Sequence, residues 1–379
     1  LDWTNPEVAD ELDDVLRFWA GRGVDGFRID VAHGMVKADG LPDLDLSLDL
    51  YRDETRRFPM WDQPGVHDVH QRWRRLVDEL PGDLMLCGEA WVEPPAALAL
   101  YVRPDELHQT FNFGYLMTPW NATAQREAIT SSLASVAPYG APQTWVLSNH
   151  DVVRHATRLG RSDATVEVVT EGIGPDDPQP DADLGLRRAR AATALMLALP
   201  GSAYLYQGEE LGLPDATRLA DDDLRDPTWE RSGHARRGRD GCRVPVPWEA
   251  TGASCGFSPT GASWLPQPDV YRTLAAELQD GVEGSTLELY RHLVRLRRER
   301  RLGRGELTWV DVPDADVVAF TTTHDGLATT VLTTVAGTGT ALPPDLEVLA
   351  SSGPLDGSTL PPDTTVWLAG ALAPSATAP

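Results

Sequence analysis

The chain has 379 residues, of which 41% are hydrophobic and 24% are charged, so it can bury a sizeable core and is not a disordered chain. Its 57 acidic residues outnumber its 33 basic ones and give a formal net charge of −24. That balance argues against nucleic acid and against an anionic membrane surface as partners, because both bind basic protein surfaces. The three cysteines form no CxxC pair and no disulfide framework, and we expect neither a metal nor a cofactor.

The N-terminal part of the chain alternates helical and strand patterns. Asn5 followed by Pro6 is typical of a helix start, and we expect that helix to run to about Gly21. Its apolar positions recur at helical spacing and predict one inward face, formed by Val8, Leu12, Val15, Leu16 and Trp19. Further along, we expect a strand at 24–30, a long loop at 37–65, a helix at 66–80 and a strand at 84–89.

The same alternation continues through the middle of the chain. In order, we expect a strand at 107–113, a helix at 121–137, a strand at 143–149, a helix at 186–199, a strand at 203–207 and a helix at 287–300. Polar stretches rich in Gly, Pro and Asp predict loop insertions near 158–185 and 214–278. Alternating strands and helices of this kind predict an α/β fold with parallel strands.

The pattern changes after residue 304. Short β-branched runs split by Gly and Pro replace the helical period, which predicts a small antiparallel β-sandwich domain at 305–379. Residues 1–304 supply about five strand–helix units, whereas a (β/α)8 TIM barrel needs eight. We therefore expect 1–304 to be the C-terminal portion of a catalytic barrel, about strands 4–8, with the first three units upstream of Leu1.

Three carboxylates follow predicted strands, which is where barrel enzymes carry their catalytic groups. They are Asp30, Glu89 and Asp151. A single acid at a strand end is more often a structural ion pair, but three on separate strands favour catalysis. Alternation places Arg28 on the same face as Asp30, and a neighbouring guanidinium favours the ionised carboxylate that a nucleophile needs. Glu89 follows an apolar strand and precedes Trp91, a setting that favours the protonated form of a general acid.

Sequence motifs around these carboxylates resemble those of the α-amylase-type glycoside hydrolases, glycoside hydrolase family 13. GFRIDVAH at 26–33 resembles the family's nucleophile segment, GEAW at 88–91 its acid/base segment, and SNHD at 148–151 its third-carboxylate segment. Their order agrees with barrel strands four, five and seven. YQGEELG at 206–212, RDGCRVP at 239–245 and LPPDT at 360–364 are similar to the α-glucosidase and oligo-1,6-glucosidase branch of that family.

The resemblance implies a retaining hydrolase that cleaves α-glucosidic bonds in short oligosaccharides of the maltose or isomaltose type. Asp30 would be the nucleophile that forms a covalent glucosyl intermediate, Glu89 the acid/base and Asp151 the stabiliser of the transition state. Substrate-binding roles would fall to Arg28, His150, Arg154 and His33. The alternative for His33 is to cap a loop, and the alternative for Arg154 is a surface ion pair. Sugar-stacking platforms are expected among Trp91, Phe113 and Trp248, although most large aromatic residues pack in cores.

The chain departs from the family pattern at its N-terminal side. The family's first motif, an Asp followed by Asn-His at the end of strand three, is absent, as are the first strands and most of the loop domain after strand three. We therefore expect the 379 residues alone to be inactive and prone to aggregate. No apolar run is long enough to span a bilayer, and we expect a cytoplasmic location.

Two other functions stay open. A transglycosylating or isomerising relative, acting on trehalose or sucrose, would share the chemistry up to the covalent intermediate and differ in whether water or sugar accepts the glucosyl group. A non-catalytic relative would usually lack the carboxylate set, which is present here. The residue after the expected nucleophile is Val31, and a valine there tends to accompany action on α-1,6 bonds in this family.

Overall fold

The computed structural model describes residues 1–43, 58–163 and 165–373. They form two compact units, which we describe separately. The first comprises Leu1–Tyr115 and Ala128–Trp145, and the second comprises Leu116–Glu127 and Val146–Pro379. Residues 44–57 of the predicted long loop lie outside the described residues.

The first unit opens with helix α1 (Pro6–Ala20), which begins where the sequence predicts. The Asn5 side chain accepts a hydrogen bond of 3.0 Å from the Glu7 amide, and Pro6 occupies the first helical turn. Proline is favoured there because its fixed φ suits the helix and its missing N–H would have no partner. The helix ends before Gly21, whose amide donates to the Arg17 carbonyl. Both predicted end signals are confirmed.

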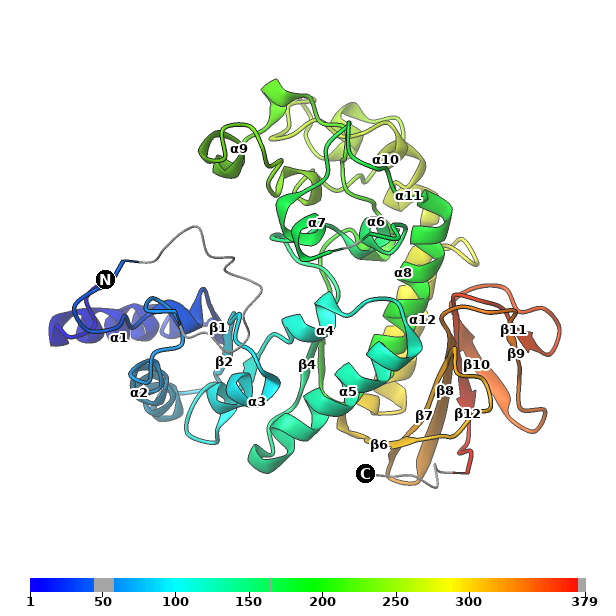
Figure 1. Ribbon diagram of the computed structural model, residues 1–379, viewed down its shortest axis with the longest axis horizontal. Helices are drawn as coiled ribbons and strands as arrows, with labels where there is room; N and C mark the ends of the chain where they lie inside the picture. The colour runs from blue at the N-terminus through cyan, green and yellow to red at the C-terminus, as the bar shows by residue number, and fades with distance from the viewer. Residues whose placement is uncertain (44–57, 164, 374–379) are drawn as a thin grey trace. The chain divides into compact units, whose positions relative to one another are not determined.

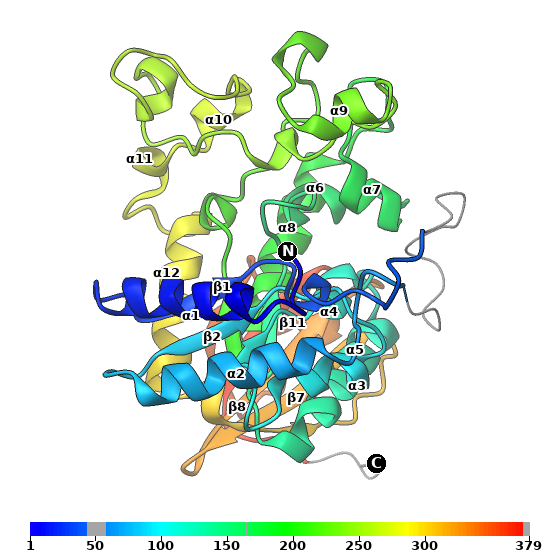
Figure 2. The same ribbon diagram turned by 90° about the vertical axis from the view of Figure 1, so that its left-hand side faces the viewer.

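The predicted inward face of α1 is only half right. Leu16 is buried in the core, but Val15 and Trp19 are 42% and 48% exposed. Asp13 takes an inward position instead, because Arg72 of helix α2 (Val66–Glu79) binds its carboxylate at 2.9 Å. The two helices pack side by side, as Figure 2 shows. An apolar period cannot reveal such an ion pair, since its partner lies far along the chain.

A three-stranded parallel sheet carries the first two candidate carboxylates. Its strands are β1 (Gly26–Ile29), β2 (Met85–Gly88) and β3 (Gln109–Thr110), in the order β1-β2-β3. The register pairs Gly26 with Met85 and Ile29 with Gly88, so β1 and β2 end at the same edge. Glycine is required at position 26, because a Cβ atom would lie 2.3 Å from the Met85 carbonyl oxygen. The predicted parallel pairing is confirmed.

Short helices complete the first unit and cross into the second along the sequence. In chain order, these helices are η1 (Ala32–Gly34), α3 (Pro95–Leu98), η2 (Ala99–Val102), α4 (Phe113–Met117), α5 (Ala122–Val136) and η3 (Ala137–Tyr139). The strand β4 (Thr144–Val146) follows them. The strand predicted at 107–113 is cut short, because Asn112 accepts a 2.9 Å bond from the Tyr115 amide and so starts α4. The strand predicted at 143–149 is likewise confined to β4.

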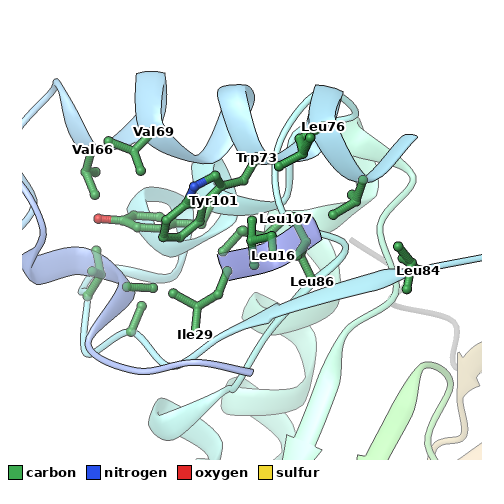
Figure 3. Close-up of a cluster of buried hydrophobic side chains, with 14 residues drawn as sticks. Leu16, Ile29, Val66, Val69, Trp73, Leu76, Leu84, Leu86, Tyr101 and Leu107 are labelled. Atoms are coloured by element: carbon green, nitrogen blue, oxygen red, sulfur yellow. The ribbon is translucent and has the colours of Figure 1, made fainter. Parts of the chain in front are cut away.

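The core of the first unit lies between α2 and the sheet. Figure 3 shows Trp73 and Leu76 pointing from α2 towards Ile29 and Leu86 of the strands, with the Tyr101 ring among them. All five side chains are buried. Burying one such side chain stabilises a fold by roughly 1.5–3 kcal/mol, so this packing fixes the two strands that end at Asp30 and Glu89.

The second unit is built on two long helices, α8 (Ala182–Leu197) and α12 (Thr286–Glu299), which run side by side in Figure 1. Helix α8 begins before the predicted residue 186, because the Asp181 side chain accepts a 2.9 Å bond from the Leu184 amide. It packs tightly against α6 (His155–Arg158). A Cβ atom on Gly185 would lie 2.1 Å from the Ala156 carbonyl oxygen, so only glycine permits this approach.

The two predicted insertions contain short helices as well as loops. The first, near 158–185, includes α7 (Val166–Glu171) and the first turn of α8. The second, near 214–278, includes η5 (Asp221–Asp223), α9 (Pro227–Arg231), η6 (Asp240–Cys242), η7 (Ala253–Gly256), α10 (Val270–Thr273) and α11 (Ala276–Gln279). Between the insertions lie α8, β5 (Ser202–Tyr204) and η4 (Glu209–Leu211).

An antiparallel sheet ends the second unit and confirms the predicted change of pattern. Its strands follow η8 (Leu302–Arg304) and are β6 (Glu306–Trp309), β7 (Val317–His324), β8 (Leu327–Thr334), β10 (Glu347–Ser351) and β12 (Thr364–Ala369), in the order β10-β12-β8-β7-β6. A separate pair joins β9 (Thr340–Ala341) to β11 (Thr359–Leu360). The Trp367 indole of β12 donates to the Ala194 carbonyl of α8 at 2.9 Å. The domain boundary expected between 304 and 305 lies inside this compact unit and stays a prediction.

No helix among the described residues is both long and apolar enough to cross a membrane. The cytoplasmic location stays a prediction. The incompleteness of the barrel and the inactivity of the 379 residues alone also stay predictions.

A buried carboxyl in η4 predicts how the stability of the second unit depends on pH. The Glu209 side chain accepts a 3.1 Å bond from the Tyr206 amide through Oε1, while Oε2 has no partner. Burial raises the pKa of Glu209 to about 8. Between the ordinary value of about 4.5 and about 8, the unfolded chain ionises this carboxyl while the folded chain keeps it protonated. The free energy of unfolding therefore falls as pH rises through this window.

Replacing Glu209 with glutamine removes this penalty and keeps an acceptor for the Tyr206 amide. We expect Glu209→Gln to raise the free energy of unfolding at pH 8 by roughly 4 kcal/mol, with little change at pH 4. Urea unfolding across that pH range, with the exposed Glu283→Gln as the control, measures it. Equal pH slopes in wild type and Glu209→Gln would contradict the assignment.

Candidate active site

Asp30 and Glu89 stand next to each other at the carboxyl edge of the parallel sheet. Each follows the last residue of its strand, and the register pairs Ile29 with Gly88. The ladder continues one step further, since the Glu89 amide donates to the Ile29 carbonyl and the Ala32 amide to the Glu89 carbonyl, both at 2.8 Å. Neighbouring strands lie about 4.8 Å apart, so the fold brings together two carboxylates that are distant in the sequence.

One guanidinium group spans the two carboxylates. Arg28 Nη1 lies 2.7 Å from Asp30 Oδ1, and Nη2 lies 3.9 Å from Glu89 Oε2. The predicted pairing of Arg28 with Asp30 is therefore present. The Asp30 side chain is 72% exposed, whereas that of Glu89 is only 8% exposed. An exposed carboxylate is accessible to a ligand, and a buried one is shielded from water.

Val31 links the end of β1 to the Glu89 carboxylate. Its backbone is left-handed, with φ 45° and ψ 46°, a conformation that β-branched residues rarely adopt. This conformation aims the Val31 amide at Glu89 Oε2, to which it donates at 2.8 Å. Backbone strain of this kind gathers at functional sites, where the surrounding structure holds it. The Val31 side chain is 43% exposed.

His33 lies beneath this loop and not on its surface. It is 3% exposed, and its ring packs 5.5 Å from the Trp61 ring. Burial lowers the pKa of His33 to about 4, so the ring is neutral at physiological pH. Its carbonyl accepts a 2.8 Å bond from the Asp62 amide, which fits the loop-capping alternative. The substrate-binding role stays a prediction.

Two of the expected stacking platforms contact each other. The Trp91 and Phe113 rings stack with their centroids 4.1 Å apart. Phe113 is buried, so it supports Trp91 from one side. Trp248, in the second unit, is 55% exposed. Sugar stacking on these rings stays a prediction.

Asp151, in the second unit, sits in a cluster of cationic side chains. Arg239 Nη1 and Arg243 Nη2 both bind its Oδ1, at 2.8 Å and 2.9 Å. His150 Nε2 lies 3.2 Å from the other oxygen, Oδ2. Arg243 also donates to the His150 carbonyl at 2.7 Å, which fixes the backbone before Asp151. The carboxylate is thus held in one orientation, with both cationic arginines on Oδ1 and His150 beside Oδ2.

A second aspartate holds Arg239 in place. Arg239 donates to Asp226 Oδ2 through Nε at 2.5 Å and through its own backbone amide at 3.1 Å. Burial alone would raise the pKa of Asp226, but hydrogen bonds from Arg239 and Thr228 outweigh it and lower that pKa well below its usual range. Asp226 therefore remains ionised and orients the guanidinium that binds Asp151.

Arg154 is a buried brace and not a surface residue. It is 1% exposed, and its guanidinium donates to the carbonyls of Gln207 at 2.8 Å and Cys242 at 2.9 Å. Its charge also lies over the Tyr206 ring, 4.7 Å from the centroid. Arg154 thereby joins the YQGEELG and RDGCRVP segments, and the surface ion pair considered from the sequence is wrong. Direct contact with sugar stays a prediction.

The SNHD segment is anchored from behind by buried hydrogen bonds. Ser148 Oγ and His155 Nδ1 are 2.8 Å apart, and the His155 amide donates to the same hydroxyl at 2.9 Å. His155 is fully enclosed, and burial lowers its pKa well below the usual value, so the ring is neutral. These bonds position the backbone before Asp151 without reaching solvent.

Within the first unit, the neighbouring Asp30 and Glu89 carboxyl groups can supply a nucleophile and an acid to the same ligand. Paired carboxylates on adjacent strands, one exposed and one buried, are what a two-step displacement at a sugar carbon needs. Sequence reasoning missed the roles of Arg239 and Arg243, although both lie in the RDGCRVP motif. Their spacing around Gly241 was the available signal, since it places two cations on one side of a turn.

Comparison with known proteins gives the family. Residues 1–305 match the α-amylase family, specifically its catalytic domain. The chain is 31% identical over 351 residues to Maltase A1 of Drosophila melanogaster, covering 86% of this chain and 56% of that protein. It is 30% identical over 326 residues to a probable alpha-glucosidase of Rhizobium meliloti (strain 1021), covering 82% and 55%. The chain thus spans about half the length of these curated relatives.

Solved structures agree with this match. The alpha-glucosyl transfer enzyme XgtA matches 98% of this chain and 68% of its own, with a TM-score of 0.79 and 28% identity. The trehalulose synthase MutB from Pseudomonas mesoacidophila MX-45 matches 97% and 69%, with a TM-score of 0.77 and 25% identity. The predicted (β/α)8 class follows from the family match, and the predicted C-terminal antiparallel sheet is present in the structure. The chain therefore belongs to the α-amylase family of glycoside hydrolases, glycoside hydrolase family 13.

Proposed function

We propose that this protein hydrolyses α-glucosidic bonds in short oligosaccharides of the maltose or isomaltose type, with retention of configuration, through a covalent glucosyl-Asp30 intermediate. The observation that carries the proposal is the pairing of Asp30 with Glu89 at one sheet edge, bridged by Arg28. Retaining glycosidases use two carboxyl groups about 5–5.5 Å apart, a scale that neighbouring strands provide. The names of the relatives, Maltase A1 and probable alpha-glucosidase, support the same substrate class.

In the first step, the Asp30 carboxylate attacks the anomeric carbon while the bond to the glycosidic oxygen breaks. Glu89 gives its proton to that oxygen, so the leaving sugar departs as a neutral alcohol. Glu89 then removes a proton from water, which attacks the same carbon and releases Asp30. The Val31 amide donates to Glu89 Oε2 and so helps to orient the carboxyl group. Arg28 donates to Asp30 Oδ1 and so orients the nucleophile.

Asp151 is proposed to stabilise the transition state by binding sugar hydroxyls through Oδ2. His150 beside it would donate to the same sugar, as its exposed ring is free to reach a ligand on one side. Arg28 and His33 on the first unit and Arg154 on the second complete the proposed substrate-binding set. For Arg154 and His33 we propose an indirect part, in which they hold the loops that contact the sugar, and their burial supports it.

A substrate panel tests the proposal. The full-length protein is given maltose, isomaltose, sucrose and trehalose. The anomer of the glucose released from an aryl α-glucoside, whose leaving group is not a sugar, is followed by nuclear magnetic resonance. We expect glucose from maltose or isomaltose, and α-glucose from the aryl glucoside before mutarotation. Initial release of β-glucose, or no cleavage of any of the four, would overturn it.

Transfer to a sugar instead of water is the second candidate. It is favoured by the two solved relatives, one titled an alpha-glucosyl transfer enzyme and the other a trehalulose synthase. The same panel separates the two functions, because transfer places the glucosyl group in a new disaccharide or trisaccharide, and only the leaving sugar can then appear free. A non-catalytic role would leave all four sugars intact.

Linkage preference can be tested at Val31, which is exposed beside Asp30. Threonine matches valine in volume but adds a hydroxyl that can bond an incoming sugar hydroxyl. We expect wild type to hydrolyse isomaltose, and Val31→Thr to shift the ratio of kcat/KM towards maltose by about five- to tenfold, which corresponds to about 1 kcal/mol.

Val15→Thr is the matched control, since Val15 is 42% exposed on α1 and Val31 is 43% exposed. The control should leave the ratio of the two efficiencies unchanged. If wild type ignores isomaltose and Val31→Thr keeps the wild-type ratio, Val31 does not set linkage.

A further inference from the structure

A cluster of metal-ligating side chains lies in the first unit, outside the set of residues used above. His67 and His70 stand three residues apart on α2, and Glu106 lies in the segment between η2 and β3. Each offers one ligand atom, and the three atoms lie within 4.8 Å of one another. His70 and Glu106 are fully buried, while the His67 side chain is 17% exposed.

The distances suit a small cation. His67 Nδ1 lies 2.8 Å and His70 Nδ1 lies 3.9 Å from the same oxygen, Glu106 Oε2. A tetrahedral ion with bonds of about 2.0–2.1 Å holds its ligands about 3.3 Å apart, a spacing that falls between the two. A small shift of Glu106 Oε2 away from His67 and towards His70 would equalise them.

The buried ring of His70 points to a bound ligand. Neither of its ring nitrogens has a hydrogen-bond partner, although the ring lies close to the backbone of Ala32. A buried polar group without a partner is destabilising, so native structures rarely keep one without a reason.

Glu106 is already oriented as a ligand would be. Arg103 Nε donates to Oε1 at 2.7 Å, and Arg74 donates to the Glu106 backbone carbonyl at 3.1 Å. Oε1 is therefore occupied, and Oε2, which shares a 2.8 Å hydrogen bond with His67 Nδ1, also faces the His70 ring. Ligating carboxylates are commonly held by such outer hydrogen bonds. The Arg103 side chain is 33% exposed, so water screens its charge from the cluster.

We propose that His67, His70 and Glu106 form a zinc-class metal site that ties α2 to the segment before β3. Two imidazoles and one carboxylate favour zinc or its first-row neighbours over calcium and magnesium, which take oxygen ligands. The exposed side of His67 leaves room for water as a fourth ligand. The site departs from the sequence expectation of no metal, and its role is structural because α2 covers the strands that end at Asp30 and Glu89.

Metal titration of the full-length protein tests the site. After dialysis against a chelator, the protein is titrated with Zn²⁺ by calorimetry and with Co²⁺ by visible absorption, which reports tetrahedral nitrogen ligation. His67→Ala and Glu106→Gln are compared with His234→Ala, a control at an exposed histidine. Circular dichroism checks that each variant folds, and His67, being partly exposed, is the substitution the fold should tolerate best.

We expect wild type and His234→Ala to bind one equivalent of Zn²⁺, to show the Co²⁺ bands and to gain thermal stability with metal. His67→Ala and Glu106→Gln should lose at least tenfold in affinity and should lose the bands. Absence of one-equivalent binding in wild type, or equal binding in wild type and the two cluster variants, would overturn the site. These readouts do not depend on sugar hydrolysis, so the site and the proposed function can fail separately.

Discussion

Asp30→Ala is expected to lower kcat on maltose or isomaltose by roughly 10⁴-fold or more, because it removes the group that forms the covalent bond to glucose. The fold should persist. The Asp30 side chain is 72% exposed and pairs with a half-exposed Arg28, so its removal should change the free energy of unfolding by about 0–1 kcal/mol. Steady-state kinetics and urea unfolding of the same preparation measure both effects.

Asp25→Ala is the matched control, since Asp25 is an exposed aspartate immediately before β1, at the opposite end of the same strand. It should keep near-normal turnover. Sodium azide sharpens the test, because it can replace a missing nucleophile. Asp30→Ala with azide and an activated α-glucoside should give the inverted β-glucosyl azide. Near-normal turnover in the Asp30→Ala variant would exclude Asp30 as the nucleophile.

Glu89→Gln is expected to lose about 10²–10⁴-fold in kcat/KM on disaccharides, whose leaving oxygen must be protonated. The loss of rate should be much smaller for the first step with α-glucosyl fluoride, because its fluoride leaving group departs without being protonated. Glutamine keeps an oxygen for the Val31 amide, so the local structure should remain. Parallel assays on maltose and the fluoride measure the difference.

With azide, Glu89→Gln should give a product of opposite stereochemistry to the product of Asp30→Ala. Azide should attack the glucosyl-Asp30 intermediate and give the retained α-glucosyl azide, since it needs no general base. The exposed Glu79→Gln on α2 serves as the control. Equal losses on both substrate classes, with no azide product, would show that Glu89 is not the acid/base.

The placement of the candidate carboxylates in the first unit could be predicted almost completely from the sequence. Asp30 and Glu89 each follow a short apolar strand, and a parallel register is the natural arrangement of strands separated by a helix. Strand alternation also predicted the contact between Arg28 and Asp30. These inferences succeed because they depend on local periodicity and on one topological rule.

Other features could not be predicted, because they depend on partners brought together by the fold. The left-handed backbone of Val31 is contrary to the local preference of a β-branched residue, and it is explained by the hydrogen bond that the Val31 amide donates to Glu89 Oε2. Helix α1 turned Asp13 inward because Arg72 lies opposite it. Arg239 became a partner of Asp151 through a long loop that carries no periodic signal.

The histidine cluster shows the same limit. His67 and His70 form an ordinary helical spacing that occurs on many surfaces, and Glu106 joins them only when η2 and β3 pack beneath α2. Burial, which decides between a surface pair and a ligand set, cannot be read from spacing alone.

Trapping the intermediate tests the central claim most directly. The full-length protein is incubated with 5-fluoro-α-glucosyl fluoride, which forms the covalent intermediate faster than water removes it, and then digested for mass spectrometry. The account predicts that the peptide containing Asp30 gains the mass of one fluoroglucosyl group, with the ester on Asp30 and no adduct in Asp30→Ala. An adduct on another residue, or turnover with no adduct at any residue, would contradict it.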